Sequence, residues 1–304
     1  MAIEIDLIDT SPEARTSHLA RKPDWLRVSL PGGEDYERVR TKVNALGLNT
    51  VCKEAACPNV AECWGAGTAT IMILGDTCTR GCRFCNVKTG NPKGVVDWLE
   101  PARVGDAVRD LGWKYLVLTA VDRDDLADGG ALIFANTIRA IRERAPEAKV
   151  EILSGDYRGN LSALNIVMDA RPDVFAHNLE TVRRLTPGVR DKRATFDQSL
   201  RILNHAKERA PSRYTKTSIM LGLGETADEI ESTMDDARSA GVNIFTMGQY
   251  LAPSKRHLPV REFVTPEQFT ALGALAETKG FHQVVSSPLS RSSYHAEQAF
   301  SEGL

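Results

Sequence analysis

Residues 69–85 read ATIMILGDTCTRGCRFC, and this stretch decides which fold the rest of the chain builds. It opens with a short apolar run containing several β-branched side chains, which is typical of a buried strand. Three cysteines, Cys78, Cys82 and Cys85, follow on one short loop and are called the loop triplet below. In parallel α/β folds the chemistry lies at the carboxyl ends of the strands, so this loop is the expected centre of the site.

Beyond the loop, strand-like and helix-like segments alternate. Apolar, β-prone runs recur at 115–121, 150–154, 174–179, 217–223 and 243–251. Segments with helical periodicity lie between them, most clearly at 130–144, 225–241 and 265–280. Strands that alternate with helices form βαβ units and a parallel sheet. Six such units are too few for an eight-unit barrel, so we expect a six-unit partial barrel, with an open doubly wound sheet as the alternative.

The domain organisation follows from the same alternation. Residues 1–68 read as an irregular N-terminal arm with one short helix at 36–46, residues 69–280 as the barrel, and residues 281–304 as a C-terminal tail. Three further cysteines, Cys52, Cys57 and Cys63, lie on the arm and are called the arm triplet below.

The cysteine pattern favours metal over disulfides. All six cysteines lie between residues 52 and 85. Disulfides are typical of small secreted domains with inadequate cores, and a chain of this length has no such need. Three thiolates at Cys-x3-Cys-x2-Cys spacing can hold three corners of a cubane iron–sulfur cluster and leave the fourth iron open to a small molecule. Structural zinc is the alternative, although zinc normally takes four ligands.

The composition argues against a nucleic-acid-binding, membrane-spanning or secreted protein. The 304 residues carry 38 basic and 40 acidic side chains, for a net charge of −2. This balance offers no electrostatic footprint for nucleic acid or an anionic membrane. No apolar run approaches the roughly 18–20 residues of a membrane span. The first residues, MAIEIDLIDTSPEART, lack the pattern of a secretory signal. We therefore expect a cytoplasmic protein, and take it to be a monomer.

The loop triplet, with the aromatic Phe84 before its last cysteine, resembles the radical S-adenosylmethionine (SAM) superfamily. That resemblance implies the partial barrel, with N-terminal and C-terminal extensions, and a cluster whose open iron binds SAM. The arm triplet at Cys-x4-Cys-x5-Cys spacing makes the match more specific, because the two triplets in this order resemble lipoyl synthases. Further matching stretches span about residues 22–296: VDRDDLADGGA (121–131), HNLETVRRL (177–185), LGLGET (221–226), QYLAPS (249–254), HLPV (257–260) and RSSYHA (291–296).

The resemblance to lipoyl synthases implies two 4Fe–4S clusters and a sulfurtransferase reaction. The loop triplet would bind the cluster that cleaves SAM to a 5′-deoxyadenosyl radical. The arm triplet would bind an auxiliary cluster that is the source of sulfur, with Ser293 as its fourth ligand and Ser292 as the alternative. Two sulfur atoms would enter carbons 6 and 8 of an octanoyl group, and one SAM would be cleaved for each.

The resemblance also implies partners. The octanoyl group would be carried on a lysine of a glycine cleavage H protein or of a lipoyl domain of a 2-oxoacid dehydrogenase. A flavodoxin or ferredoxin would supply electrons, and iron–sulfur assembly proteins would rebuild the auxiliary cluster. Two other functions stay open. One is a methylthiotransferase, which usually carries additional RNA- or protein-binding domains, and the other is an iron–sulfur sensor or zinc-binding module.

Candidate SAM contacts lie where the predicted strands end. Asp122 follows the second strand and is a candidate for holding the SAM amino group. Asn178 and Glu180 follow the fourth strand and are candidates for contacts with the ribose or the methionyl part. His177 alternates with them and is interpreted as a packing residue. One segment, SGDYRG (154–159), departs from the Pro-Asp-Phe that is usual in the resembling family.

Three further candidates come from the rest of the barrel. Gly222 and Gly224 resemble a dinucleotide fingerprint, but the acid expected about 20 residues later is missing. We interpret them as a tight turn that gives backbone access to adenine. Arg190 and Arg193 are candidates for the SAM carboxylate or for acids on a carrier protein, with solvated loop charge as the alternative. Phe84 is expected to contact the cofactor.

Overall fold

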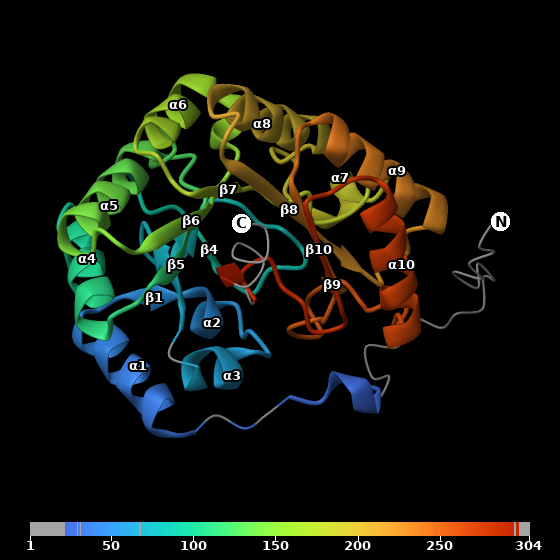
Figure 1. Cartoon of the computed structure of the whole chain (residues 1–304), viewed down its shortest axis with the longest axis horizontal. Coiled ribbons are helices and arrows are strands. Elements are labelled where there is room, and N and C mark those ends of the chain that lie inside the picture. Colours follow the sequence, from blue (N-terminus) through green and yellow to red (C-terminus); the bar gives the residue numbers. More distant parts are fainter. Residues whose placement is uncertain (1–21, 29, 31, 67, 295, 298–304) are drawn as a thin grey trace.

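The computed structural model describes residues 22–294 apart from 29, 31 and 67, together with residues 296 and 297. These residues form a curved sheet of eight strands, in the order β1-β2-β5-β6-β7-β8-β9-β10, with helices along its outer side (Figure 1). All neighbouring strands are parallel except β1 and β2, which are antiparallel. The strands are β1 (Asn49–Thr50), β2 (Thr70–Ile73), β5 (Tyr115–Ala120), β6 (Lys149–Leu153), β7 (Val174–Ala176), β8 (Tyr214–Leu221), β9 (Ile244–Gln249) and β10 (Gln283–Ser286).

The predicted six units are present in the predicted order. A helix follows each of the strands β2, β5, β6, β7, β8 and β9 before the next strand of the eight-stranded sheet begins. These helices are α4 (Glu100–Leu111), α5 (Ala131–Arg144), α6 (Leu161–Asp169), α8 (Phe196–Arg209), α9 (Ala227–Ser239) and α10 (Pro266–Thr278). A short helix, α7 (Thr186–Val189), precedes α8. The sheet extends beyond the six predicted strands at both edges, because β1 comes from the arm and β10 from the tail.

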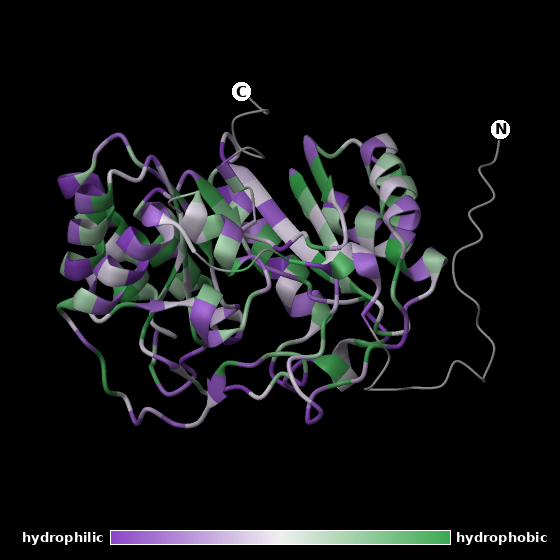
Figure 2. Ribbon diagram, turned by 90° about the horizontal axis from the view of Figure 1, so that it is seen from below, coloured by the Kyte–Doolittle hydropathy of each residue, from purple (hydrophilic) through white to green (hydrophobic). Residues whose placement is uncertain are grey.

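Helix boundaries follow the sequence signals. On α9, within the helix predicted at 225–241, one face is buried, formed by Ile230, Thr233, Met234 and Ala237, and Thr226 and Glu229 form a capping box at its start. Thr265 and Gln268 form the same motif at the start of α10. Hydrophobic residues are concentrated in the strands and between them and the helices, while hydrophilic residues dominate the outward helix faces (Figure 2). The core therefore lies between the sheet and its helices.

The arm is more helical than predicted. Besides α1 (Glu34–Ala45), it contains α2 (Val51–Glu54) and α3 (Val60–Gly65), and it has a 3-10 turn, η1, at Asp24–Leu26. Helices of four and six residues are too short to show a periodic pattern, and they depend on tertiary packing for their stability. The expectation of a single helix in the arm was therefore wrong for residues 51–65.

The tail packs on the face of the sheet that is turned away from the helices. Gly248 of β9 has no side chain there, and a Cβ at this position would collide with the carbonyl oxygen of Ser290. Further on, Ala296 is buried against Tyr115 and Val117 of β5. The tail thus runs across the concave side of the sheet, from β9 to β5.

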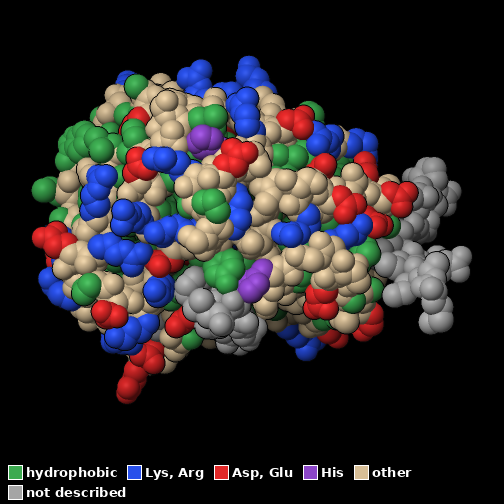
Figure 3. Space-filling model, turned by 45° about the horizontal axis from the view of Figure 1, so that its top comes forward, with side chains coloured by type: hydrophobic (Ala, Val, Ile, Leu, Met, Phe, Trp, Pro, Cys, Tyr) green, Lys and Arg blue, Asp and Glu red, His purple; other side chains and the backbone are tan. Residues whose placement is uncertain are grey.

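The surface charges and the character of the helices bear on the expected class of protein. Basic and acidic side chains are mixed on the face shown in Figure 3, in line with the net charge of −2. Among the described residues, no helix has both the length and the apolar character needed to cross a membrane.

Candidate functional site

The loop triplet lies at the carboxyl end of β2, on a loop closed by two short paired strands, β3 (Thr77–Cys78) and β4 (Lys88–Thr89). Backbone hydrogen bonds attach this loop to the ends of other strands. The Thr79 N–H donates to the Asp122 carbonyl after β5 at 2.9 Å, and the Arg83 N–H donates to the Val189 carbonyl at 2.9 Å. The barrel therefore fixes the loop from two sides.

The thiols of the loop triplet are half-buried, and two of them receive backbone hydrogen bonds. The Arg80 N–H donates to Cys78 Sγ at 3.4 Å, and the Asp191 N–H donates to Cys82 Sγ at 3.3 Å. Burial raises the pKa of Cys78 to about 11 and that of Cys82 to about 12. The thiols therefore lose their protons when iron binds, and N–H groups directed at sulfur stabilise the thiolate form.

The arrangement of the ligands fits a cluster. Within the described residues, no three His, Cys, Asp or Glu side chains converge as they would around a single metal ion. A cubane cluster takes one thiolate for each iron, so its cysteines need not converge on one point. The loop triplet supplies three thiols of this kind on one short loop, which fits a 4Fe–4S cluster with one open iron.

Asn178, just after β7, and Arg190, just after α7, each have a buried polar atom without a partner in the described part of the chain. Asn178 donates to Glu180 Oε1 at 3.2 Å and to Ser292 Oγ at 3.4 Å, but its own oxygen is buried without a donor. Arg190 donates to Ser199 Oγ at 2.7 Å, but its Nε is buried without an acceptor. Buried polar groups are normally hydrogen-bonded, so an open acceptor and an open donor here fit a polar ligand such as SAM.

Glu180 and Asp122 bring carboxylates to the same edge. Glu180 has φ of +69°, which is strained for a residue other than glycine, and its backbone bridges to Ile219 of β8. Burial raises the pKa of Glu180, and it raises the pKa of Asp122 to about 6. A Cβ on Gly155 would collide with Asp122 Oδ1, so the glycine of the SGDYRG segment leaves room for this carboxylate.

His177 has the packing role that its place in the sequence predicts. Its Nδ1 lies 2.8 Å from the Ser154 carbonyl and its Nε2 lies 2.9 Å from Ser199 Oγ. Because a carbonyl oxygen only accepts, the Nδ1–H donates to Ser154, and Nε2 of the neutral ring accepts from the Ser199 hydroxyl. Burial, reinforced by the charge of Arg190, lowers the pKa of His177 to about 4, so the ring is neutral at pH 7.

The other residues predicted to contact SAM have different surroundings in the structure. Gly222 and Gly224 have φ of +94° and +105°, as a tight turn requires, but the N–H of Gly222 already donates to Glu225. Phe84 packs into an apolar cluster with Tyr250. Arg190 is buried, so the interpretation as solvated loop charge was wrong for it.

The arm triplet lies under the tail. Cys52 is in α2 and Cys63 is in α3. Burial, followed by the charges of Cys52 and Cys57, raises the pKa of Cys63 to about 12. The Asn59 amide donates to the Leu289 carbonyl at 2.8 Å, which ties the arm to the tail.

Residues 291–294, called the RSSY motif below, lie beside the arm triplet. The Tyr294 hydroxyl donates to Glu62 Oε1 at 2.7 Å, and Glu62 precedes Cys63 directly. The Ser292 hydroxyl is used by Asn178, whereas Ser293 makes no hydrogen bond to the part of the chain that the structure describes. Ser293 therefore has the hydroxyl available for a cluster at the arm triplet. His295, at the end of the matching stretch, lies outside the described residues.

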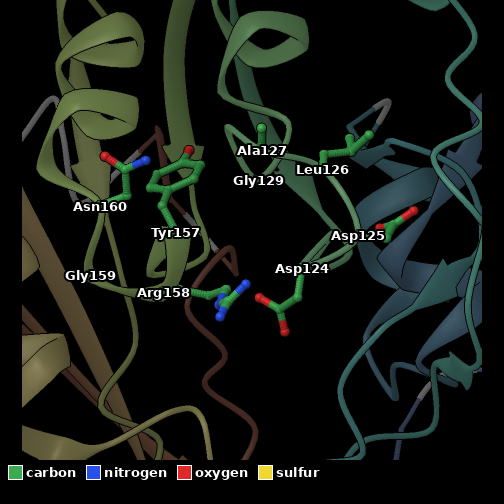
Figure 4. A pocket seen from close by; sticks show the side chains of 9 residues that line it. All are labelled: Asp124, Asp125, Leu126, Ala127, Gly129, Tyr157, Arg158, Gly159 and Asn160. Carbon is green, nitrogen blue, oxygen red and sulfur yellow. The ribbon is translucent and has the colours of Figure 1, made fainter.

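Sequence reasoning missed a set of charged residues beside the loop triplet. Arg80, within the triplet, binds Asp124 and Asp156. The signals in the sequence were an arginine inside the cysteine motif and acids at two strand ends. Asp124 also lines a cavity of about 440 Å³, across which the Arg158 side chain points toward it (Figure 4).

Comparison with known proteins first defines the class. The radical SAM superfamily matches residues 72–237. The hydrogenase maturase HydG from Carboxydothermus hydrogenoformans has a similar fold, with a TM-score of 0.53 at 13% identity, covering 88% of this chain and 70% of HydG. SuiB of Streptococcus suis, solved with S-adenosylmethionine, gives a TM-score of 0.50 at 14% identity over 72% of this chain and 49% of SuiB. The chain belongs to the radical SAM superfamily, and its fold is that of this class.

More specific matches follow. The N-terminal domain of lipoyl synthase matches residues 6–57. The lipoyl synthase of Thermus thermophilus is 55% identical over 281 residues, which is 92% of this chain and 87% of the relative. That of Marinobacter nauticus is 50% identical over 299 residues, which is 98% of this chain and 86% of the relative. The chain belongs to the lipoyl synthase family.

Proposed function

We propose that this protein inserts two sulfur atoms into a protein-bound octanoyl group, at carbons 6 and 8, and so makes the lipoyl cofactor. The observation that carries the proposal is the pairing of two cysteine triplets within one fold. The loop triplet lies among candidate SAM contacts, and the arm triplet lies under a tail that presents Ser293. Identity of 55% to a lipoyl synthase over 92% of the chain supports the same activity.

The cofactors are two 4Fe–4S clusters and SAM. When bound, they supply the electron, the 5′-deoxyadenosyl radical and the sulfur atoms of this reaction. The loop triplet holds one cluster, and the arm triplet holds the other with Ser293 as the fourth ligand. A hydroxyl is a harder ligand than a thiolate and leaves more readily, which suits a cluster that is consumed.

Four side chains at the strand ends are assigned to SAM. Asp122 holds the ammonium group, and the unpartnered Nε of Arg190 faces the carboxylate, since each pairs with the opposite charge. Asn178 and Glu180 contact the ribose or the methionyl part. The open oxygen of Asn178 accepts from a ligand hydroxyl or amine.

Two candidates near the adenine have smaller roles. Phe84 forms part of an apolar wall with Tyr250. In the turn that Gly222 begins, Glu225 engages the N–H of Gly222, so Gly224 is the better candidate for a backbone contact. Positioning decides the outcome of the reaction, because the carbon that reacts must lie close to both the radical and the sulfur donor.

The substrate protein is an octanoylated lipoyl carrier, either a glycine cleavage H protein or a lipoyl domain of a 2-oxoacid dehydrogenase. A flavodoxin or ferredoxin delivers the electrons, and iron–sulfur assembly proteins refill the arm triplet. We place the enzyme in the cytoplasm as a monomer. Six free cysteines support a reducing compartment, because thiols there remain available to iron.

The test uses protein reconstituted with both clusters under anaerobic conditions. It is incubated with SAM, dithionite and an octanoylated H protein, and the intact mass of the H protein is recorded. The proposal predicts a gain of two sulfur atoms, with two hydrogens fewer once the dithiol is oxidised. An unchanged mass, while an active lipoyl synthase converts the same substrate, contradicts it. About eight iron atoms per chain and no zinc exclude a zinc module.

A further inference from the structure

Arg80 lies between the first two cysteines of the loop triplet, and its side chain is only 2% exposed. Its Nε and Nη2 donate to the two oxygens of Asp124, both at 2.9 Å. Its Nη1 and Nη2 donate to the two oxygens of Asp156, at 2.9 and 2.7 Å. One guanidinium therefore binds two carboxylates, each through two hydrogen bonds, which is the strongest geometry available to such pairs.

The two carboxylates come from different parts of the barrel. Asp124 follows β5, whereas Asp156 follows β6 and caps the 3-10 turn η2 (Tyr157–Gly159). Asp156 is fully buried, and although burial opposes its ionisation, the hydrogen bonds from Arg80 lower its pKa to about 2. The Arg80 side chain thus ties the cysteine loop to the ends of two adjacent strands.

A second arginine, Arg193, also contacts the residues next to Arg80. Arg193 donates to the Thr79 carbonyl at 2.8 Å and lies 3.1 Å from Asp124. Its partner Asp191 accepts from the Gly81 N–H at 3.0 Å. Arg193 and Asp191 therefore add contacts to the backbone of Thr79 and Gly81 on either side of Arg80.

We propose that Arg80 is a positioning residue that preorganises the loop triplet for its cluster and keeps Asp122 directed at the SAM site. Asp122 Oδ1 lies 3.7 Å from Arg80 Nη1, so the same guanidinium that orders the loop also sets the position of this carboxylate. Three cysteines on an unrestrained loop would have to be ordered at the moment of cluster binding, and Arg80 removes that cost. Lysine cannot replace it, because an ammonium lacks the planar fork that two bidentate carboxylates require.

The test compares Arg80→Lys with Arg83→Lys in the reconstituted enzyme. Arg83 lies in the same loop and is exposed, and among the described residues its guanidinium donates only to the Gly188 carbonyl, so it is a matched control. We expect Arg80→Lys to form 5′-deoxyadenosine about tenfold more slowly or worse, with a higher KM for SAM. The electron paramagnetic resonance spectrum of its reduced cluster should respond to SAM differently from wild type. Arg83→Lys should match wild type in all three readouts.

A second measurement separates positioning from folding. Hydrogen exchange of the cluster-free chain should speed up in residues 76–90 for Arg80→Lys while β5, β6 and β8 keep wild-type protection. Faster exchange throughout the sheet overturns the proposal, because Arg80 would then only stabilise the fold. A wild-type spectrum and KM for SAM overturn it as well. The SAM assignment of Asp122 rests on the proposed function, but the exchange and cluster readouts need no octanoyl substrate, so failure of one is distinguishable from failure of the other.

Discussion

The two cysteine triplets are supported in opposite ways. The loop triplet follows a strand of the main sheet, and both backbone and side-chain hydrogen bonds fasten it to the ends of β5 and β6 and to the segment after β7. The arm triplet lies on two short helices and the turn between them, and contacts from the distant tail complete its surroundings. Those contacts include Asn59 with Leu289 and Tyr294 with Glu62.

This difference matches the two tasks that the proposed reaction sets. A cluster that delivers an electron again and again is best served by a rigid site, because preorganised groups need no rearrangement at each turnover. A cluster that is consumed needs a site that opens to be refilled. A site shared between the arm and the tail can open by moving two segments apart while the sheet stays intact.

The sharpest test removes one thiol from each triplet. Cys82→Ala should abolish 5′-deoxyadenosine formation, and with it all lipoyl product. Cys57→Ala should retain 5′-deoxyadenosine formation and still make no lipoyl product. Both are measured by mass spectrometry after reconstitution, and each variant should hold about four iron atoms in place of about eight. Loss of 5′-deoxyadenosine in Cys57→Ala would show that the two sites do not work separately.

Removing the Ser293 hydroxyl of the RSSY motif should lower the yield of lipoyl product less than removing a cysteine does. Ser293→Ala should lower lipoyl product by about tenfold or more while 5′-deoxyadenosine forms at the wild-type rate, because it removes one ligand of four. Ser292→Ala is the matched control. It loses only a 3.4 Å hydrogen bond from Asn178, so its effect should stay within about threefold. The opposite ranking of the two variants would assign the ligand to Ser292.

Much of the structure around the two triplets could be predicted from the sequence. The strand before the loop triplet and the helix α9 could be predicted because the pattern of apolar residues along the chain indicates which face is buried. The last strand, β10, was missed because four residues next to a loop carry no periodic signal. The bond between Arg80 and Asp156 joins residues 76 positions apart, and no local pattern specifies such a contact. The position of the loop triplet after its strand was therefore predictable, but the contacts that support the loop were not.

Acid should remove the contribution of His177 to stability, although the raised pKa of Asp122 acts in the opposite direction. The pKa of His177 is about 4 in the folded chain against 6.5 in the reference state, so the unfolded chain takes up a proton first as pH falls. Stability that is full above pH 6.5 is therefore lost progressively down to about pH 4, by roughly 3 kcal/mol in total. Urea unfolding of the cluster-free chain at pH 7 and pH 5 measures this loss. His177→Gln should reduce the difference between the two pH values, and an unchanged difference would assign the loss to other groups.

The smallest effect is expected where the tail meets the arm. Tyr294→Phe removes one exposed hydrogen bond, to Glu62, which is worth about 1 kcal/mol. If the tail closes the arm triplet, iron should leave that cluster to a chelator about fivefold faster, while the cluster of the loop triplet is unaffected. Tyr36→Phe is the control, because Tyr36 also lies on the arm but contacts Trp64 through its ring, with centroids 5.2 Å apart. Equal iron release from both variants would mean that the tail does not gate the arm triplet, and the contrast between a rigid site and an openable site would then rest on the loop triplet alone.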